Sequence, residues 1–324
     1  MARSNEDVLQ QMIDAGMPLL PAHLDVCGKL RRFGPKKRGW YTLYENTARS
    51  GARYVTGAFG WWGLVDAVRV AASVEVDEDE RAERRERARL AREAEERKRR
   101  EAAERAAMRA ATRWAAAART GVSLYLRRKG VDAEAVRFEP DGSILVPMIR
   151  YDLPRERALV GLQVIGSDGT KRFGKGTAKK AAAVRLGSAL IDPHGPILIC
   201  EGLATGLTLR MACQQRYPVF AAFDAGNLVP VARVIRRLYP SAWLLFCADD
   251  DFLTWGNPGL SKALHAAMVA RNADVAKPYF RGRGARKLTD YNDLHAERGL
   301  DEVAAQLSAA ITNARTYGQR RIAA

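Results

Sequence analysis

Residues 242–251, "AWLLFCADDD", join an uninterrupted apolar run to three consecutive carboxylates. An apolar run of this length predicts a strand that is buried on both faces of a sheet. Three acids at the end of such a strand repel one another, so they either take up protons or hold a cation. The stretch therefore predicts a core strand with a candidate cation site at its carboxyl end.

The segments on either side of this strand alternate between strand and helix patterns. We expect strands over residues 196–202, 218–226, 242–251 and 275–280, and helices over residues 204–215, 230–238, 258–271 and 301–314. This alternation predicts an α/β fold in which a parallel sheet is covered by helices on both faces. In such sheets the functional residues gather at the carboxyl ends of the strands, where Glu201, Asp224 and the Asp249–Asp251 triplet lie.

Carboxylates at the ends of two predicted strands form a candidate metal site. Glu201 ends one strand, and Asp249 and Asp251 end another strand of the same sheet, so these side chains should meet at one edge. The outer two carboxylates of an Asp-x-Asp pair can turn toward the same side, which favours Asp249 and Asp251 over Asp250. Hard oxygen donors of this kind suit Mg²⁺ or Mn²⁺. The alternative, a helix N-cap, accounts for one acid but not for four.

A second acidic segment, "TDYNDLH" (289–295), follows a strongly basic one, "RGRGARK" (281–287). Acids beside a cationic loop suit a phosphate bound through a metal, because the acids hold the cation and the bases hold the remaining phosphate charge. The acids proposed as metal ligands are Asp290 and Asp293, and the bases proposed to contact nucleic acid or nucleotide are Arg281, Arg283, Arg286 and Lys287. Alternatively, Asp290 or Asn292 is only the N-cap of the next helix.

The overall charge indicates a polyanionic partner. With 53 Lys and Arg against 37 Asp and Glu, the 324-residue chain has a formal net charge of +16. Nucleic acid is the leading candidate, since cationic side chains that neutralise phosphates dominate such binding. An anionic membrane is the weaker candidate, because the sequence contains no apolar stretch of about 18 residues and no secretory signal.

The four cysteines lie far apart and form no CxxC pair, which argues against a zinc site and against a disulfide framework. Cys200 and Cys247 lie in apolar strand segments and Cys213 in a helical one, so we expect them to be small buried hydrophobic residues. This cysteine usage indicates a reducing, cytoplasmic location.

Composition divides the chain into five segments. They are a β-rich aromatic and basic module (1–73), a helical linker rich in Glu, Arg and Ala (74–119), a basic segment with two antiparallel strands (120–190), the parallel-sheet domain (191–285) and a C-terminal acidic motif with a helix (286–324). In the linker, acids repeatedly precede bases by four residues, which predicts a solvated single helix that acts as a spacer. A basic arm that contacts DNA is the alternative for this linker.

Four motifs carry a resemblance to a known family: "ICEGLATGLTL" (199–209), "FAAFDAGNL" (220–228), "FCADDDF" (246–252, with "NPG" shortly after it) and "TDYNDLH". In this order they resemble the TOPRIM domain shared by bacterial-type primases, type IA and II topoisomerases and related nucleases. More narrowly, they resemble the DNA primases of conjugative plasmids, phages and other mobile elements. The resemblance covers roughly residues 140–300 and implies a TOPRIM Rossmann-like parallel sheet with helices on both faces.

The resemblance also implies roles for particular residues. Glu201, Asp249 and Asp251 would bind Mg²⁺ and serve nucleotidyl transfer, with Asp290 and Asp293 as the downstream acidic motif. The segment "KRFGKGTAKK" (171–180) is similar to the basic motif of the primase core, so the expected template or nucleotide contacts there are Lys171, Arg172, Lys175, Lys179 and Lys180. The implied partners are a single-stranded DNA template, ribonucleoside triphosphates and a replicative helicase or other replication protein.

The N-terminal module departs from that family. It resembles the body of a zinc-binding module, but only His23 and Cys27 lie near the expected ligand positions, so we expect no zinc. We expect instead a β-rich template reader in which aromatic rings, Trp40 and Tyr41 among them, stack on bases. The alternative is that these rings form a small hydrophobic core.

Three further functions compete with a primase. A TOPRIM-type nuclease would use the same metal site to activate water. A non-catalytic accessory protein would bind single-stranded DNA with a vestigial acidic site. An ATPase is disfavoured, because "GTKRFGKG" (169–176) nearly matches a Walker A loop but has Gly176 where Ser or Thr should follow the lysine.

Overall fold

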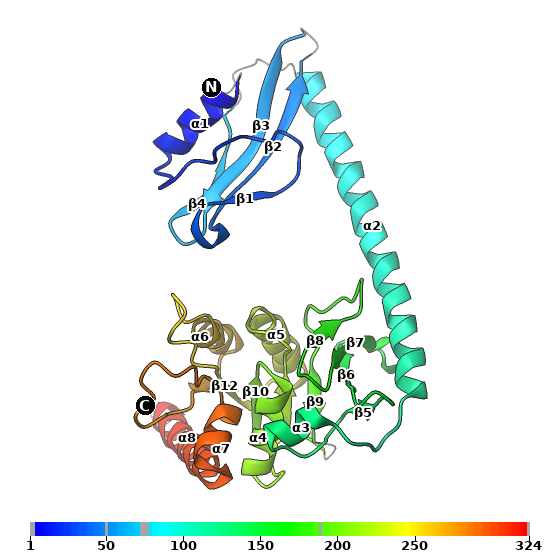
Figure 1. Ribbon diagram of the computed structural model, residues 1–324, viewed down its shortest axis with the longest axis vertical. Helices are drawn as coiled ribbons and strands as arrows, with labels where there is room; N and C mark the ends of the chain where they lie inside the picture. The colour runs from blue at the N-terminus through cyan, green and yellow to red at the C-terminus, as the bar shows by residue number, and fades with distance from the viewer. Residues whose placement is uncertain (1–3, 49–50, 72–77, 188–189, 323–324) are drawn as a thin grey trace. The chain divides into compact units, whose positions relative to one another are not determined.

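The structure of the protein is a computed structural model, drawn in Figure 1, and it describes all residues except 1–3, 49–50, 72–77, 188–189 and 323–324. The chain divides into two compact units, an N-terminal unit (Met1–Glu96) and a C-terminal unit (Arg97–Ala324). Both consist of mixed α/β structure.

The N-terminal unit is built on a four-stranded antiparallel sheet in the order β1-β2-β3-β4. Its elements are α1 (Asn5–Asp14), β1 (Arg31–Phe33), the short 3₁₀ helix η1 (Pro35–Lys37), β2 (Gly39–Thr47), β3 (Arg53–Trp61) and β4 (Val65–Arg69). Helix α1 begins with a capping box at Ser4 and buries Val8 and Met12. These two side chains join a core with Leu43 and Phe59 of the sheet.

Helix α2 (Glu78–Ala116) runs through the boundary between the two units. Ion pairs at spacings of three and four residues, such as Arg89 with Glu86 and Glu93, lie along its exposed surface. The expectation of a fully solvated spacer is wrong for the last turns, where Ala106 and Ala110 are buried. Alanine allows the helix to approach closely, and Ala110 packs with Leu145 and Leu162 of the sheet below it.

The C-terminal unit contains an antiparallel sheet in the order β5-β6-β7-β8. Its elements are α3 (Leu124–Lys129), β5 (Arg137–Phe138), β6 (Ile144–Ile149), the 3₁₀ helix η2 (Arg155–Arg157), β7 (Leu159–Ile165) and β8 (Lys171–Phe173). Strands β6 and β7 are the two antiparallel strands expected from the sequence. The sequence did not predict β5 and β8, because two or three residues are too few to show a hydrophobic period.

A second sheet of this unit has the strand order β13-β12-β10-β11-β9. Its strands are β9 (Val184–Leu186), β10 (Pro196–Cys200), β11 (Val219–Ala221), β12 (Trp243–Cys247) and β13 (Ala273–Ala276). Strands β10 to β13 are mutually parallel, and β9 closes one edge in the antiparallel direction. The expected last strand, 275–280, is shifted: it ends before Pro278, which has no backbone N–H to donate to a neighbouring strand.

Helices cover both faces of this sheet. One face carries α4 (Leu203–Ala212), α7 (Tyr291–Arg298) and α8 (Leu300–Ile322), and the other carries α5 (Leu228–Leu238) and α6 (Pro258–Ala270). Successive residues of β10 alternate between the two cores, with Ile197 and Ile199 toward α5 and α6 and Leu198 and Cys200 toward α4. Cys200, Cys213 and Cys247 are buried, as the sequence predicted. No helix among the described residues combines the length and the apolar character needed to cross a bilayer.

A buried asparagine fixes the connection between the two sheets. Asn227, which ends the 3₁₀ helix η3 (Ala225–Asn227), donates hydrogen bonds from Nδ2 to the carbonyls of Lys179, Ala182 and Ala222. Its Oδ1 accepts a hydrogen bond of 2.7 Å from the backbone N–H of Ala181. The basic segment after β8 is therefore held against the loop that follows β11.

Replacing Asn227 with alanine should destabilise the C-terminal unit by about 3 kcal/mol, because it leaves several buried backbone groups without partners. The midpoint of urea unfolding, followed by circular dichroism, measures the loss. The matched control is Asn313→Ala on the exposed face of α8, for which we expect a change within about 0.5 kcal/mol. Equal midpoints for the two variants would show that Asn227 does not hold the two sheets together.

Candidate functional site

The carboxyl ends of two neighbouring parallel strands place the predicted acids side by side. Strands β10 and β12 are paired so that Cys200 lies opposite Cys247. Glu201 follows the first of these strands directly, and Asp249 comes two residues after the second. Because the strands run in the same direction, both acids emerge at one edge of the sheet.

Asp249 is the most constrained carboxylate of this edge. Its Oδ1 is buried and has no hydrogen-bond partner among the described residues. Burial, together with the nearby charges of Asp290, Glu201 and Asp251, raises the pKa of Asp249 well above its usual range. A buried carboxylate without a hydrogen-bond donor is costly when it is ionised, unless a cation compensates its charge.

Glu201 faces the same cluster from the neighbouring strand. Burial, with the charges of Asp251 and Asp224, raises its pKa to about 7. A hydrogen bond from the backbone of Ala225 and the positive charge of Lys171 oppose this increase. Asp224 lies shortly after β11, and its charge acts on Glu201, so it belongs to the same electrostatic cluster, although the site predicted from the sequence omitted it. Its position at a strand end was the available signal.

Asp251 is held by the beginning of α6. The backbone N–H of Gly259 donates a 3.0 Å hydrogen bond to its Oδ2. A β-carbon on Gly259 would lie 2.6 Å from the carbonyl oxygen of Asp249 and 3.0 Å from Asp251 Oδ2. Helix α6 therefore approaches the acidic segment at a distance that only glycine permits, and its N-terminal dipole favours the negative charge.

The second acidic pair forms the capping box of α7. Asp290 accepts a hydrogen bond from the backbone of Asp293, and Asp293 accepts one from the backbone of Asp290. The N-cap alternative is therefore correct for Asp290. Burial and the charge of Asp293 nevertheless raise the pKa of Asp290, while Lys129 of α3 acts in the opposite direction. The two aspartates add negative charge beside Asp249 as well as capping a helix.

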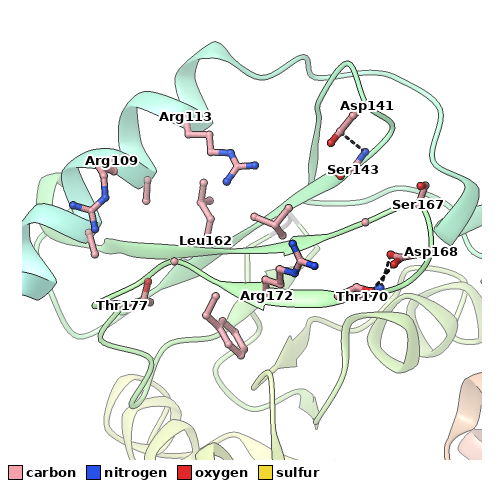
Figure 2. Close-up of a pocket in the computed structure, with 16 residues that line it drawn as sticks. Arg109, Arg113, Asp141, Ser143, Leu162, Ser167, Asp168, Thr170, Arg172 and Thr177 are labelled. Atoms are coloured by element: carbon pink, nitrogen blue, oxygen red, sulfur yellow. Dashed lines mark hydrogen bonds between the residues drawn. The ribbon is translucent and has the colours of Figure 1, made fainter.

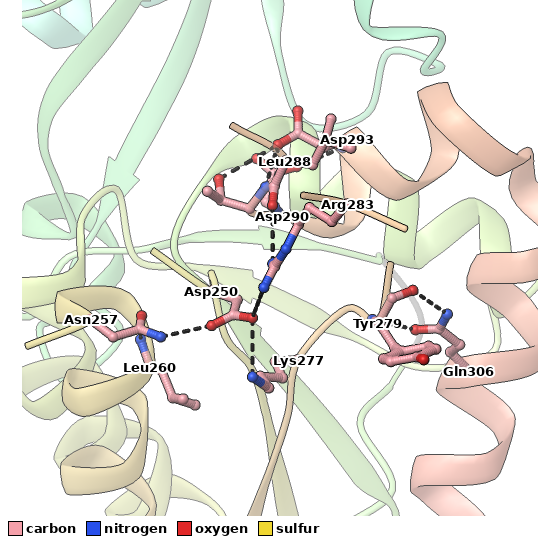
Figure 3. A network of polar contacts seen from close by, with 11 residues as sticks. Asp250, Asn257, Leu260, Lys277, Tyr279, Arg283, Leu288, Asp290, Asp293 and Gln306 are labelled. Carbon is pink, nitrogen blue, oxygen red and sulfur yellow. Dashed lines mark hydrogen bonds and ion pairs between the residues drawn. The ribbon is translucent and has the colours of Figure 1, made fainter. Parts of the chain in front are cut away.

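Asp250, the middle residue of the triplet, is buried, and Figure 3 shows its contacts with Asn257, Lys277 and Arg283. It accepts hydrogen bonds from Asn257 Nδ2 at 2.7 Å, Lys277 Nζ at 3.0 Å and the Arg283 guanidinium at 3.1 Å. Although burial acts to raise it, the hydrogen bonds from Asn257, Lys277 and Arg283 lower the pKa of Asp250. The residue is thus an ionised anchor for basic side chains.

The basic loop 281–287 has two kinds of side chain. Arg283 is largely buried: it pairs with Asp250, donates to the carbonyl of Leu288 and stacks 3.6 Å from the centre of the Phe252 ring. Arg286 pairs with Glu297 at 2.8 Å. Arg281 and Lys287 are exposed. The structure therefore gives Arg283 an internal role, whereas Arg281 and Lys287 remain exposed.

The predicted basic segment 171–180 divides in a similar way. Lys171 acts on Glu201, and Lys179 pairs with Asp224 and lies over the Phe173 ring, so both lie beside the acidic cluster. Lys175 and Lys180 are exposed. Arg172 points instead into a pocket lined by α2 and the antiparallel sheet, as Figure 2 shows.

In the N-terminal unit the two named aromatic residues differ. Tyr41 is buried in the core, and its hydroxyl group donates to the carbonyl of His23 and accepts from the N–H of Asp25. The prediction that Tyr41 stacks on bases is therefore wrong, and the core alternative holds for this ring. Trp40 is half-buried. Trp62 is more than half exposed and lies beneath the Arg32 guanidinium.

The donor chemistry of the acidic cluster suits a divalent cation. Within the described residues no three His, Cys, Asp or Glu side chains already converge as a metal site. The unpartnered buried oxygen of Asp249 and the mutual repulsion of Asp249, Glu201 and Asp251 nevertheless fit Mg²⁺ or Mn²⁺, which prefer hard oxygen ligands. Fold and site together define a mixed α/β protein with a carboxylate centre at the edge of a parallel sheet.

Comparison with known proteins adds a specific similarity. No protein-family profile matches the chain. Two curated relatives, each a DNA primase TraC of Escherichia coli, are 33% identical over 206 residues and 34% identical over 152 residues. The alignments cover 58% and 45% of this chain but 19% and 10% of the relatives, so the chain spans about a fifth or less of their length. The resemblance to DNA primases inferred from the sequence is confirmed.

Two solved structures are also similar. The primase fragment of the bacteriophage T7 primase–helicase protein is 16% identical with a TM-score of 0.38, over 56% of this chain and 69% of that one. A bacteriophage T7 lagging-strand DNA polymerase complex, with primase domains bound to an RNA/DNA hybrid and dTTP, is 16% identical with a TM-score of 0.37, over 57% and 86% of the chains. Likeness at this level carries no functional argument.

The raised pKa of Glu201 predicts how stability depends on pH. Between its ordinary pKa and a native value of about 7, the folded state binds more protons than the unfolded state, so stability falls as pH rises. In EDTA, the melting temperature should therefore decrease from about pH 5 to about pH 7.5, and Glu201→Gln should flatten this slope. The control Glu302→Gln, at an exposed position of α8, should keep the wild-type slope. Identical slopes for the two variants would contradict the assignment.

Replacing Gly259 with alanine should displace the backbone at Asp249 and weaken the binding of Mn²⁺ about tenfold or more, measured by calorimetry. Gly256→Ala is the matched control. A β-carbon there meets no atom within 4 Å, and its φ of +76° makes alanine cost about 1 kcal/mol of stability without touching the acids. Equal Mn²⁺ affinities would show that the close approach of α6 does not shape the site.

Proposed function

We propose that the chain carries the catalytic core of a DNA primase, which joins ribonucleotides into short primers on single-stranded DNA. The observation that carries this proposal is the carboxylate centre of Glu201, Asp249 and Asp251, in which Asp249 Oδ1 is buried and has no hydrogen-bond partner among the described residues. Its similarity to the DNA primases TraC supports the choice of chemistry. Because the alignments span only a small part of those relatives, the activity, substrates and partners of the chain are all part of the proposal.

We assign the parallel sheet to the TOPRIM class. Two features support the assignment: parallel strands β10 and β12 are neighbours, and the Glu-Gly and Asp-x-Asp motifs follow these two strands. Helices on both faces agree with it. The antiparallel edge strand β9 is compatible, since open α/β sheets often carry one antiparallel edge strand.

Glu201, Asp249 and Asp251 would hold Mg²⁺ or Mn²⁺, which would lower the pKa of the attacking 3′-hydroxyl group and stabilise the leaving pyrophosphate. The protein's own contribution is electrostatic. Lys171 and Lys179 lie beside the acids and are placed to neutralise phosphate charge that the carboxylates repel. Asp250 keeps the neighbouring basic loop in place through Lys277 and Arg283. No side chain is required as a general base.

The proposed partners are a single-stranded DNA template, ribonucleoside triphosphates and a replicative helicase or other replication protein. Exposed rings of the N-terminal unit, Trp62 and Tyr44, are better placed to stack on template bases than the buried Tyr41. The basic side chains around them, including Arg32, would contact phosphates.

Primer synthesis tests the proposal directly. The purified full chain, single-stranded DNA, the four ribonucleoside triphosphates and Mg²⁺ or Mn²⁺ should yield short RNA products, resolved on a denaturing gel. Asp249→Asn and Asp251→Asn should reduce this synthesis about a hundredfold or more, because each removes a negatively charged ligand of the cation. The control Asp301→Asn, exposed at the start of α8, should retain activity.

The same reaction separates the competing functions. A metal-dependent nuclease would shorten the DNA without incorporating ribonucleotides, and the same two variants would abolish the shortening. An accessory protein would bind single-stranded DNA and do neither. Either of these outcomes would overturn the proposal of a primase.

A further inference from the structure

A pocket of the C-terminal unit lies between the last turns of α2 and the antiparallel sheet (Figure 2). Its volume is about 730 Å³, within the range of small-molecule sites. The walls come from α2, the β5–β6 turn, strands β7 and β8 and the loops next to them. None of the residues that line it belongs to the parallel sheet that carries the acidic cluster.

Three guanidinium groups face this pocket, Arg109 and Arg113 from α2 and Arg172 from β8. Arg113 forms a two-pronged ion pair with Glu139, at 2.6 and 2.7 Å. Arg109 donates one hydrogen bond to the carbonyl of Lys175, which leaves its charge uncompensated. The Arg172 side chain makes no hydrogen bond or ion pair within the described chain, but it lies beside Asp168 and its positive charge acts on that carboxylate. Among the three, Arg109 is therefore the guanidinium group whose charge no carboxylate of the described residues compensates.

The end of the pocket away from Arg109 carries Arg172 together with hydrogen-bond acceptors and hydroxyl groups. Asp168 accepts from the backbone N–H and the hydroxyl of Thr170, and Asp141 accepts from the backbone N–H of Ser143. These bonds fix the carboxylates and leave further lone pairs for a ligand. The sugar hydroxyls and amino groups of a nucleoside are donors that match them.

The floor between these two ends is apolar. Leu162 and Val164 of β7 form it, with Ala106 and Ala110 of α2 above and Phe173 at the edge. A flat heterocyclic base can cover such a surface, which gains the free energy of apolar burial. The pocket thus places the Arg109 guanidinium group, an apolar floor and fixed acceptors in sequence.

We propose that this pocket binds a free nucleoside phosphate, with its phosphates at Arg109, its base on Leu162 and Val164, and its sugar hydroxyl or base amino groups at Asp168. An extended nucleic acid strand fits less well, since the carboxylates at one end would repel its backbone phosphates. The site is separate from the acidic cluster, so the inference goes beyond the proposed primase activity and does not depend on it.

The test uses the full-length chain in EDTA, so that no divalent cation supports binding at the acidic cluster. Binding of fluorescently labelled ATP and GTP is measured by anisotropy, and a labelled single-stranded oligodeoxynucleotide serves as the competing ligand. We expect nucleotide binding that Arg109→Gln weakens about tenfold or more, since it removes a charged donor. Val164→Phe, which fills the floor, should abolish it. Circular dichroism shows whether each variant folds. If Val164→Phe does not fold, the result for Arg109→Gln decides the test.

Two controls should bind nucleotide as the wild type does. Arg105→Gln removes an exposed arginine one turn earlier on α2, which pairs with Glu101 outside the pocket. Asp249→Asn changes the acidic cluster alone. The inference is overturned if neither nucleotide binds in EDTA, if binding survives Arg109→Gln, or if the pocket variants weaken only the oligodeoxynucleotide. Failure of primer synthesis with nucleotide binding intact would contradict the proposed function and leave this inference standing.

Discussion

The repulsion among partly buried carboxylates after the ends of β10 and β12 is the constraint on which the rest of the C-terminal unit depends. Burial and neighbouring acids raise the pKa of Asp249 and of Glu201, so the cluster is unfavourable in its ionised form without compensation. The surrounding elements supply that compensation in part. The N-terminus of α6 donates to Asp251, and lysines from β8 and its loop lie beside the acids.

The three consecutive aspartates differ in the groups that surround them. Asp249 belongs to the acidic cluster, while Asp250 lies within hydrogen-bond distance of Lys277 and Arg283. The same burial that raises the pKa of Asp249 is outweighed at Asp250 by donated hydrogen bonds, and its pKa is lowered. One short segment therefore provides a carboxylate whose negative charge is not compensated, at Asp249, and a carboxylate that holds the neighbouring basic loop, at Asp250.

The sequence predicted those features that follow from local patterns. Long apolar runs gave β6, β7, β10 and β12, and the position of Glu201 and Asp249 after such runs predicted a shared edge. Patterns could not predict contacts between distant segments. The internal pairing of Arg283, the burial of Tyr41 and the packing of α2 on the sheet depend on tertiary neighbours far away in the sequence. The sequence shows that Arg283 is basic and that Tyr41 is aromatic, but it does not show whether either side chain is exposed to solvent.

The strand β8 illustrates why position within the fold decides what a basic residue does. Its consecutive residues Lys171 and Arg172 have the same charge, yet the first acts on Glu201 and the second faces the pocket beneath α2. Phe173 borders that pocket and packs edge-on against Phe223, the residue before Asp224. Alternation along a three-residue strand thus directs neighbouring cations to two separate places. A basic motif that is uniform in sequence is thereby divided between the acidic cluster and a second surface.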